Sequence, residues 1–284
     1  MTNVDSIREL FGKYVPVEKS FDKHILKEYI QFETLDFLAR HKFNEKLVFI
    51  GGTALRIAYN IDRFSEDLDF DCKEFSKDEF MVLTNDVVRF LANNGYDVAT
   101  NDRPNPRLKA FRRNILFPKL LYDEGLSPYP EERFLLKIEA EDQGVDYPIE
   151  KRIISRSGFY FPISLPTVDV LCAMKVSAFL NRAKGRDIYD LMFLLGQTKP
   201  NISYLDQKMG IRSEHEVWEA IREKLSQIDV EHKSKDFTHL LFNKSNANKV
   251  FFFSEMVELE LHSLDKENVT KKIAHKKKGK SHRL

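Results

Sequence analysis

The stretch FIGGTALRIAYNIDRFSEDLDFD, residues Phe49–Asp71, decides the fold. The apolar run LVFI before the glycine pair is typical of a buried strand that leaves the core through a tight turn. The segment TALRIAYNI restores a helical pattern, and we expect Thr53 to cap that helix at its N-terminus. After Arg63, apolar and acidic residues alternate, which predicts a second strand with Leu68 and Phe70 on one face.

The acidic residues of this second strand share its other face. Asp67 and Asp69 lie two positions apart, so their side chains project on one side about 6.5–7 Å from each other. Carboxylates placed in this way suit one or two hard cations, Mg²⁺ or Mn²⁺, and Glu139 on a neighbouring strand is the candidate third ligand. Two metal ions about 3.5–4 Å apart would stabilise the entering and leaving oxygens of phosphoryl transfer. Of the three aspartates, Asp71 is the weakest candidate for a metal ligand, and we expect it to be exposed.

The glycine pair adds a candidate phosphate site beside these acids. Gly51 and Gly52 have no Cβ, so their N–H groups can come close to an anion. The helix start near Thr53 supplies further N–H donors and the positive end of a dipole. Taken separately, the acids suit a solvated strand edge and the glycines suit an ordinary strand-to-helix turn. Their combination is what nucleotidyl transfer requires.

The rest of the chain predicts an α+β N-terminal part followed by an all-α part. Before residue 144 we expect helices at 22–40 and 77–93 and strands at 114–122 and 134–141. Proline and glycine at 144–166 indicate irregular structure and the domain boundary. Beyond it we expect helices at 167–180, 187–195, 214–227 and 250–264. The predicted domains are a core at 1–165, a helical domain at 166–270 and a basic, disordered tail at 271–284.

The composition excludes several other classes of protein. With 42% hydrophobic and 31% charged residues among 284, the chain can bury a core and is not a disordered or low-complexity protein. The two cysteines, Cys72 and Cys172, belong to no CxxC motif, which argues against a disulfide framework and against structural zinc. The sequence shows no signal-peptide pattern and no apolar run long enough to span a bilayer. We therefore expect a reduced, cytoplasmic protein that makes no membrane contact.

The formal net charge of +1 conceals an uneven distribution of charge. Residues 271–284 carry seven basic groups and no acid, so the remainder has 38 basic and 44 acidic side chains, a net charge of −6. This tail would be either a nucleic-acid tether or only a solubilising end. A second basic segment, NDRPNPRLKAFRR at 101–113, would contact an RNA backbone or a triphosphate, or would be a solvated loop. Its basic residues are Arg103, Arg107, Lys109, Arg112 and Arg113.

The strings GGTALR and RFSEDLDF together resemble the signature of the AbiEii/AbiGii toxin family. That family consists of DNA polymerase β-like nucleotidyltransferases that act as toxins in type IV toxin–antitoxin and abortive-infection systems. The segment KIEA at Lys137–Ala140 resembles the strand that carries the family's third carboxylate. The segment AMKVSAFLNRAKGRDIYDL at Ala173–Leu191 resembles the later motifs of the family. The resemblance therefore implies a polymerase β-like core, a mixed sheet with flanking helices, followed by an all-α domain.

The resemblance also implies a role for each matching residue. Gly52 and Thr53 would form the phosphate-binding turn, with Arg56 on the following helix and support from Arg63 and Ser65. The implied metal ligands are Asp67, Asp69 and Glu139, the last a glutamate where the family more often has aspartate. Lys175 would contact nucleotide phosphates and Asp187 would be an essential acid, with Asp190 as a second candidate. From the residues alone, Arg63 would also serve as an ion-pair partner of the aspartates, and Asp187 as a helix cap.

The expected activity is metal-dependent transfer of NMP from an NTP to an acceptor hydroxyl. By resemblance the acceptor is RNA, with the tRNA 3′ end as the best candidate, and a cognate antitoxin is a possible partner. One alternative is the same fold transferring NMP to a protein hydroxyl, and another is a nucleotide-binding regulator without turnover. A P-loop NTPase is disfavoured because the sequence has no GxxxxGK[ST] motif, and a zinc hydrolase because it has no HExxH motif.

Overall fold

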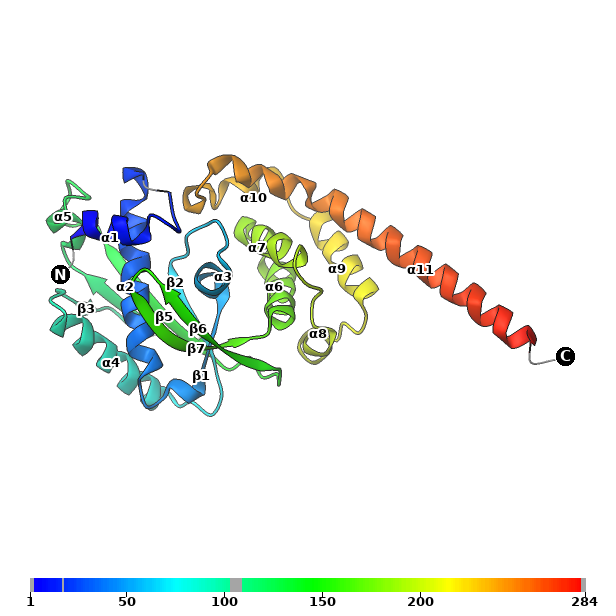
Figure 1. Cartoon of the computed structure of the whole chain (residues 1–284), viewed down its shortest axis with the longest axis horizontal. Coiled ribbons are helices and arrows are strands. Elements are labelled where there is room, and N and C mark those ends of the chain that lie inside the picture. The colour runs from blue at the N-terminus through cyan, green and yellow to red at the C-terminus, as the bar shows by residue number, and fades with distance from the viewer. Residues whose placement is uncertain (1–2, 17, 103–108, 282–284) are drawn as a thin grey trace. The chain divides into compact units, whose positions relative to one another are not determined.

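The computed structural model describes residues 3–16, 18–102 and 109–281, with side chains described up to Glu267. The chain divides into two compact units (Figure 1). Unit 1 comprises Met1–Thr167 together with Leu240–Asn243, and unit 2 comprises Val168–His239 together with Lys244–Leu284.

Unit 1 contains a five-stranded mixed sheet with the order β1-β2-β5-β4-β3. Strands β2 and β5 run parallel, whereas the other neighbouring pairs are antiparallel. This sheet confirms the predicted α+β class. The strands are β1 (Leu47–Ile50), β2 (Asp67–Cys72), β3 (Ala99–Thr100), β4 (Phe111–Phe117) and β5 (Phe134–Glu141).

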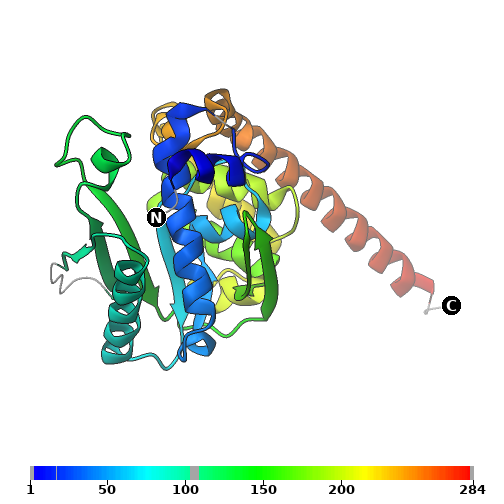
Figure 2. The ribbon, with the colours of Figure 1, turned by 60° about the vertical axis from the view of Figure 1, so that its left-hand side comes forward.

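Helices flank this sheet in unit 1. Helices α2 and α4 lie beside each other in both ribbon views (Figures 1 and 2), and the rings of Phe37 and Phe90 stack between them with centroids 4.6 Å apart. Helix α4 begins with a capping box in which Ser76 and Glu79 exchange hydrogen bonds, so its start is encoded locally. The helices are α1 (Val4–Phe11), α2 (Asp22–Ala39), α3 (Gly51–Tyr59), α4 (Lys77–Asn93) and α5 (Leu120–Asp123), with 3₁₀ turns η1 (Lys19–Phe21) and η2 (Asn44–Lys46).

The predicted helices at 22–40 and 77–93 and the strand at 134–141 are confirmed. The strand predicted at 114–122 is wrong in its bounds, because β4 spans Phe111–Phe117 and a short helix follows it. Pro118 has no N–H for the ladder and Lys119 has a φ of 58°, and together they end the strand. Thr53 is not the N-cap of α3, which begins two residues earlier with Ile50 in the cap position.

The irregular structure predicted at 144–166 is also wrong. These residues form a hairpin of β6 (Ile149–Arg156) and β7 (Phe159–Pro166), which Figure 2 shows as a ribbon separate from the five-stranded sheet. Ser157 and Gly158 both have positive φ, 53° and 85°, the combination that a two-residue hairpin turn requires. The Ser-Gly pair is therefore a local turn signal within the predicted irregular segment.

Unit 2 is helical. Helices α6, α7 and α9 agree with the predicted ones to within a few residues, and the ring of Phe179 packs edge-on against Phe253 at 5.8 Å. The last helix is longer than predicted and its backbone stays helical through part of the tail that we expected to be disordered, while 282–284 lie outside the described residues. The elements are α6 (Val168–Arg182), α7 (Gly185–Leu195), α8 (Ile202–Met209), α9 (Glu214–Ser226), α10 (Val230–Lys235), η3 (Thr238–Leu240), η4 (Lys244–Phe252) and α11 (Phe253–Ser281).

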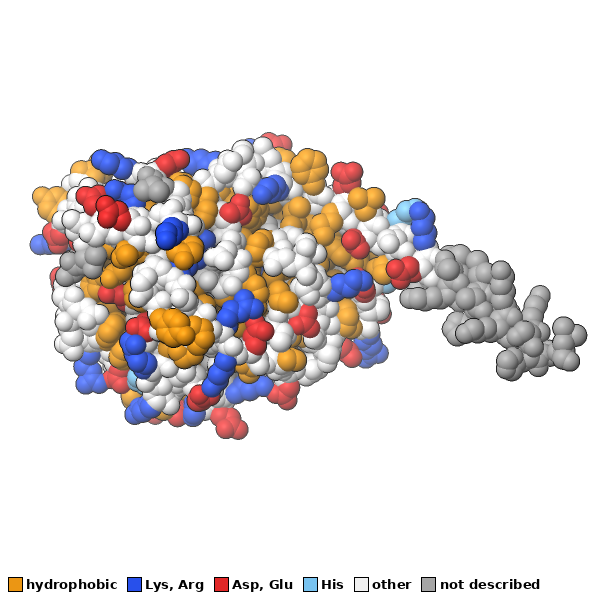
Figure 3. All heavy atoms as spheres, in the orientation of Figure 1, with side chains coloured by type: hydrophobic (Ala, Val, Ile, Leu, Met, Phe, Trp, Pro, Cys, Tyr) orange, Lys and Arg blue, Asp and Glu red, His pale blue; other side chains and the backbone are white. Residues whose placement is uncertain are grey.

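The surface carries both signs of charge. On the face drawn in Figure 3, basic and acidic side chains of the described residues are interspersed. Within the described part of the chain, no helix has both the length and the apolar character needed to cross a membrane.

Candidate functional site

The turn between β1 and α3 is built from glycine for two separate reasons. Gly51 has a φ of +81°, a conformation that other residues adopt only with strain. A Cβ at Gly51 would also overlap the carboxylate of Asp69 and lie 3.0 Å from its Cβ. A Cβ at Gly52 would lie 2.6 Å from Arg63 Nη2 and 2.8 Å from Ser65 Oγ. The structure thus brings Arg63, Ser65 and Asp69 against the glycine pair.

The start of α3 has no side-chain cap from the residue before it. Ile50 occupies the cap position and contributes no side-chain hydrogen bond, so the first N–H groups of the helix receive no cap from it. Thr53 is fully buried, and its Oγ1 donates a hydrogen bond of 2.5 Å to the carbonyl oxygen of Asp67. This bond fastens the first turn of α3 to the start of β2.

The three predicted carboxylates lie on two adjacent strands. Asp69 and Glu139 are register partners across the parallel pair β2 and β5, and Ile50 is the register partner of Asp69 on β1. Asp67 lies two residues earlier on β2, opposite Lys137. The sheet therefore places Asp67, Asp69 and Glu139 in one group beside the glycine turn.

Two basic side chains form ion pairs with these carboxylates. Lys137 Nζ lies 2.7 Å from Asp67 Oδ2 and 3.8 Å from Glu139 Oε1, and Arg112 on β4 forms an ion pair with Glu139. Lys137 is not among the predicted site residues, although it lies on the same face of its strand as Glu139. Arg112 had entered only as one residue of the basic segment 101–113.

The donor set fits a hard divalent cation in its chemistry, because all three groups offer carboxylate oxygens. Among the described residues, however, no group of three or more Asp, Glu, His or Cys side chains is arranged to hold a metal ion. Asp67 and Glu139 instead accept from Lys137 and Arg112. Metal binding by these carboxylates would compete with these ion pairs.

Asp71, the third aspartate of β2, is buried, which corrects the expectation that it is exposed. Its carboxylate accepts hydrogen bonds from the backbone N–H of Gln143, at 2.9 Å, and from the hydroxyl of Tyr147. Burial raises the pKa of Asp71 above its usual value, and the two hydrogen bonds oppose that effect. Asp71 therefore stabilises the chain after β5 and does not join the other two aspartates.

Hydrogen bonds and a β-bridge hold the loop between α3 and β2 in place. Arg63 is buried, its Nη1 donates to the carbonyl oxygen of Phe64 at 2.8 Å, and its backbone forms a bridge with Leu241. Gln31 on α2 donates to the carbonyl oxygen of Ser65 at 3.0 Å. These bonds hold the Arg63 and Ser65 side chains against Gly52.

Arg56 lies in a buried ion network of unit 1. Its guanidinium donates to Glu28 at 2.9 Å and 3.1 Å and to the carbonyl oxygens of Ile61 and Tyr14 at 3.3 Å and 3.0 Å. Arg156 from β6 donates to the same Glu28 carboxylate at 3.0 Å. The structure gives no support to a phosphate contact by Arg56, because such a contact would break this network.

Arg113 is similarly engaged. It is buried and pairs with Asp102 at 2.6 Å, and its Nη2 donates to Asn85 at 2.8 Å. Lys109 is exposed, whereas Arg103 and Arg107 lie outside the described residues. Of the described arginines in the basic segment, Arg112 is thus the one that reaches the carboxylate group.

The site residues predicted in unit 2 form two ion pairs between α6 and α7. Lys175 is 6% exposed and its Nζ lies 2.7 Å from Asp190 Oδ2. Asp187 is fully buried and accepts from Arg182 at 2.8 Å and 2.9 Å and from the backbone N–H of Lys184 at 3.2 Å. The alternative role of Asp187 as the N-cap of α7 is wrong in its position, because Lys184 is the cap residue and Asp187 lies in the first turn.

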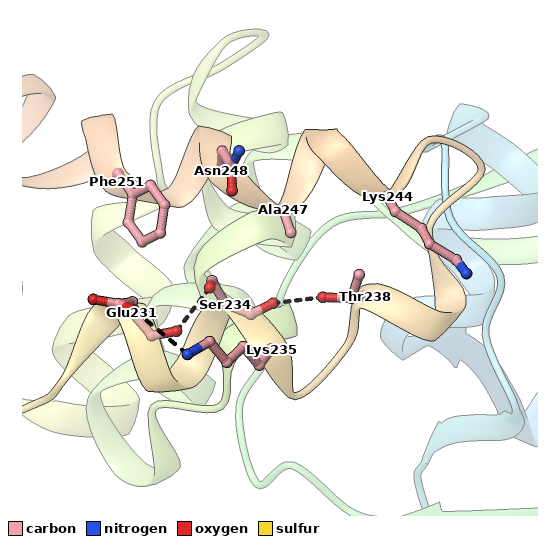
Figure 4. Close-up of a pocket in the computed structure, with 8 residues that line it drawn as sticks. All are labelled: Glu231, Ser234, Lys235, Thr238, Lys244, Ala247, Asn248 and Phe251. Carbon is pink, nitrogen blue, oxygen red and sulfur yellow. Dashed lines mark hydrogen bonds and ion pairs between the residues drawn. The ribbon is translucent and has the colours of Figure 1, made fainter.

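A groove in unit 2 is separate from all of these residues. Its volume is about 590 Å³, and it lies between α10 and η4 (Figure 4). The hydroxyls of Ser234 and Thr238 donate to backbone carbonyl oxygens, and Lys235 pairs with Glu231. None of the predicted site residues lines it. The lining residues are Glu231, Ser234, Lys235, Thr238, Lys244, Ala247, Asn248 and Phe251.

Three of the solved structures that are similar to this chain come from Helicobacter pylori and Mycobacterium tuberculosis. JHP933 from Helicobacter pylori is 18% identical, with a TM-score of 0.49, over 88% of this chain and 97% of that one. A putative nucleotidyltransferase from H. pylori is 18% identical, with a TM-score of 0.46, over 84% and 96% of the two chains. MenT4, a nucleotidyltransferase toxin from Mycobacterium tuberculosis, is 16% identical, with a TM-score of 0.48, over 88% and 98%.

None of the curated proteins compared with this chain matches it. The model of one protein family, described as the nucleotidyl transferase AbiEii toxin of a type IV toxin–antitoxin system, matches residues 35–272. The matched range contains the glycine turn, all three carboxylates and the ion pairs of α6 and α7. The chain therefore belongs to the AbiEii family of nucleotidyltransferase toxins of type IV toxin–antitoxin systems.

Proposed function

We propose that this nucleotidyltransferase toxin transfers NMP from an NTP to a hydroxyl of RNA, with the 3′ end of tRNA as the acceptor. The observation that carries the proposal is the position of Asp69. It contacts the glycine turn at Gly51 and is in register with Glu139 on the neighbouring strand. A phosphate bound at the turn would therefore lie beside the carboxylate group.

The turn and the loop before β2 would bind the triphosphate. The N–H groups at the start of α3 would donate to phosphate oxygens, and the positive end of the helix dipole would stabilise their charge. Arg63 and Ser65, which lie against Gly52, would brace the turn that holds the phosphates. These groups would hold the α-phosphate in place for attack, so much of the rate enhancement would come from positioning.

Asp67, Asp69 and Glu139 would hold Mg²⁺ or Mn²⁺. A cation there would neutralise negative charge on the phosphates as the reaction proceeds. The acceptor oxygen would form a bond to the α-phosphorus, the bond from that phosphorus to the bridging oxygen would break, and pyrophosphate would leave. The acceptor proton would pass to the carboxylate nearest to it, for which Glu139 is the candidate.

Lys175 and Asp187 are included in the proposal on the family resemblance. Their ion pairs with Asp190 and Arg182 give each side chain a defined orientation between α6 and α7. The NTP is the substrate that the family implies, and a cognate antitoxin is the expected partner. We place the reaction in the cytoplasm, where nucleoside triphosphates and tRNA are present.

The direct test is transfer of label from each of the four NTPs, labelled in the α-phosphate, into total cell RNA. Asp69→Asn should lower transfer by at least about a hundredfold, because the charge is lost at the centre of the site. The control Asp97→Asn removes an exposed carboxylate and should leave transfer unchanged. An Asp69→Asn protein with full activity would rule out this mechanism. Label that survives RNase and is lost with protease would identify a protein acceptor instead.

A further inference from the structure

The carboxylate group of unit 1 contains its own positive charges. Lys137 lies between two of the three acids, with Nζ 2.7 Å from Asp67 and 3.8 Å from Glu139. The guanidinium of Arg112 pairs with Glu139 from the other neighbouring strand, where the two residues are in register. Both basic residues therefore reach the carboxylates from fixed positions on the sheet.

These positive charges reduce the repulsion between the carboxylates. Carboxylates on adjacent strand positions repel each other, and such repulsion destabilises the fold unless a cation compensates it. Lys137 and Arg112 supply that compensation in this structure. Their side chains are 23% and 37% exposed, so both retain contact with solvent and neither is locked in place by burial.

The neighbouring arginine shows the difference between an exchangeable pair and a fixed one. Arg113 is 4% exposed and is held by Asp102 and Asn85 on the opposite face of β4. Arg112 and Lys137 have long side chains on rigid strands, so rotation about side-chain bonds suffices to move their charges. Guanidinium and ammonium groups are also the groups that proteins use to bind phosphate.

We propose that Lys137 and Arg112 are exchangeable counter-ions of the active site. They neutralise Asp67 and Glu139 until a divalent cation binds, and the displaced ammonium and guanidinium then contact the phosphates of the nucleotide. Cation binding and nucleotide binding are coupled in this way through two side chains that change partners. The inference rests on the proposed function, which assigns the three carboxylates as metal ligands.

Binding of Mn²⁺ without nucleotide tests the first half of the exchange. Paramagnetic resonance of free Mn²⁺ measures its affinity for the wild-type protein and for the variants Lys137→Met and Arg112→Met. We expect each variant to bind Mn²⁺ alone about two- to fivefold more tightly, since the cation no longer displaces a partly exposed ion pair. Thermal unfolding gives a second measurement, in which saturating Mn²⁺ should raise the melting temperature of each variant by more than that of the wild type.

Nucleotide binding tests the second half. The probe is a nucleoside triphosphate analogue with a methylene group between the α and β phosphorus atoms, titrated at saturating Mn²⁺. Here we expect each variant to bind about tenfold more weakly, because a charged hydrogen-bond donor to phosphate is missing. A residue with a merely structural role would not shift the two affinities in opposite directions.

Lys46→Met is the matched control. Lys46 pairs with Glu79 at 2.8 Å, and Lys46 is 36% exposed, between 23% for Lys137 and 37% for Arg112. Lys46→Met should leave the Mn²⁺ and nucleotide affinities at their wild-type values. If Lys137→Met and Arg112→Met also leave both affinities unchanged, the proposed exchange of partners is wrong. Asp69→Asn separates that failure from failure of the proposed function. If wild type and Asp69→Asn bind Mn²⁺ with nucleotide equally well, the metal assignment itself fails.

Discussion

Asp69 and Glu139 are 70 positions apart in the sequence and face each other in register on the parallel strands β2 and β5. A second register pair, Asp67 and Lys137, lies two residues before them. One parallel strand pair thus carries three acids and one base within two successive rows. Because β1 also pairs with β2, the same rows adjoin the glycine turn.

The glycine turn provides a prediction with a built-in control. Gly51→Ala and Gly95→Ala both place a side chain at positive φ, +81° and +91°, so each should lose about 1–2 kcal/mol of unfolding free energy. A Cβ at Gly95 meets nothing within 4 Å, whereas one at Gly51 meets the Asp69 carboxylate. We therefore expect Gly51→Ala alone to lower NMP transfer, by about a hundredfold. Urea unfolding and transfer assays measure the two effects, and equal transfer by both variants would contradict the contact.

The ion network around Glu28 predicts a large loss of stability. Glu28, Arg56 and Arg156 are all buried, and burial lowers the pKa of Arg156 to about 10 against the opposing charge of Glu28. Glu28→Gln leaves two buried guanidinium groups without their counter-charge and should cost about 3–5 kcal/mol in urea unfolding. The double variant Glu28→Gln with Arg156→Met should lose less than the sum of the single losses. Additive losses would mean that the two residues do not interact as the structure shows.

A pH dependence follows from Glu33. Burial raises its pKa, and the hydroxyl of Tyr96, which donates to Glu33 at 2.7 Å, opposes that effect. The folded protein therefore binds this proton more tightly than the unfolded chain does. Its contribution to stability is present at low pH and is lost as pH rises from the usual glutamate value through the raised one. The unfolding free energy of Glu33→Gln should fall less than that of wild type as the pH rises above the usual glutamate pKa.

The control for this prediction is Glu131→Gln, whose side chain is exposed. It should follow the wild-type dependence on pH. Identical behaviour of Glu33→Gln and Glu131→Gln would show that folding does not raise the pKa of Glu33.

The basic C-terminal segment predicts a change in RNA binding. Deleting residues 271–284 removes seven basic side chains and no acid. RNA affinity should fall and should depend less steeply on salt, because fewer counterions are released from the RNA, while NTP binding should be unchanged. A full-length variant with the six lysines of this segment changed to glutamine keeps the chain length and should behave in the same way. Unchanged RNA affinity in both proteins would assign the segment no part in RNA binding.

Patterns within short stretches predicted much of this molecule. Alternation of acids with Leu68 and Phe70 predicted β2, and the glycine pair predicted the turn before α3. The same stretches carry the resemblance to the family that the chain belongs to. Such features depend on neighbours within a few residues, so they can be read without knowing the fold. Local patterns were less reliable at 144–166, where the turn at Ser157 and Gly158 makes a hairpin of a segment predicted to be irregular.

The partners of charged side chains depended on contacts between distant segments. The sequence presented Arg56, Asp71 and Lys137 as similar polar positions on regular elements, yet packing buries the first two in separate networks and places Lys137 between Asp67 and Glu139. The sequence alone therefore determined the strands and the glycine turn of the stretch Phe49–Asp71 and the family to which the chain belongs. Only the tertiary structure decided which charges meet, because strand register and burial bring together residues that no local periodicity relates.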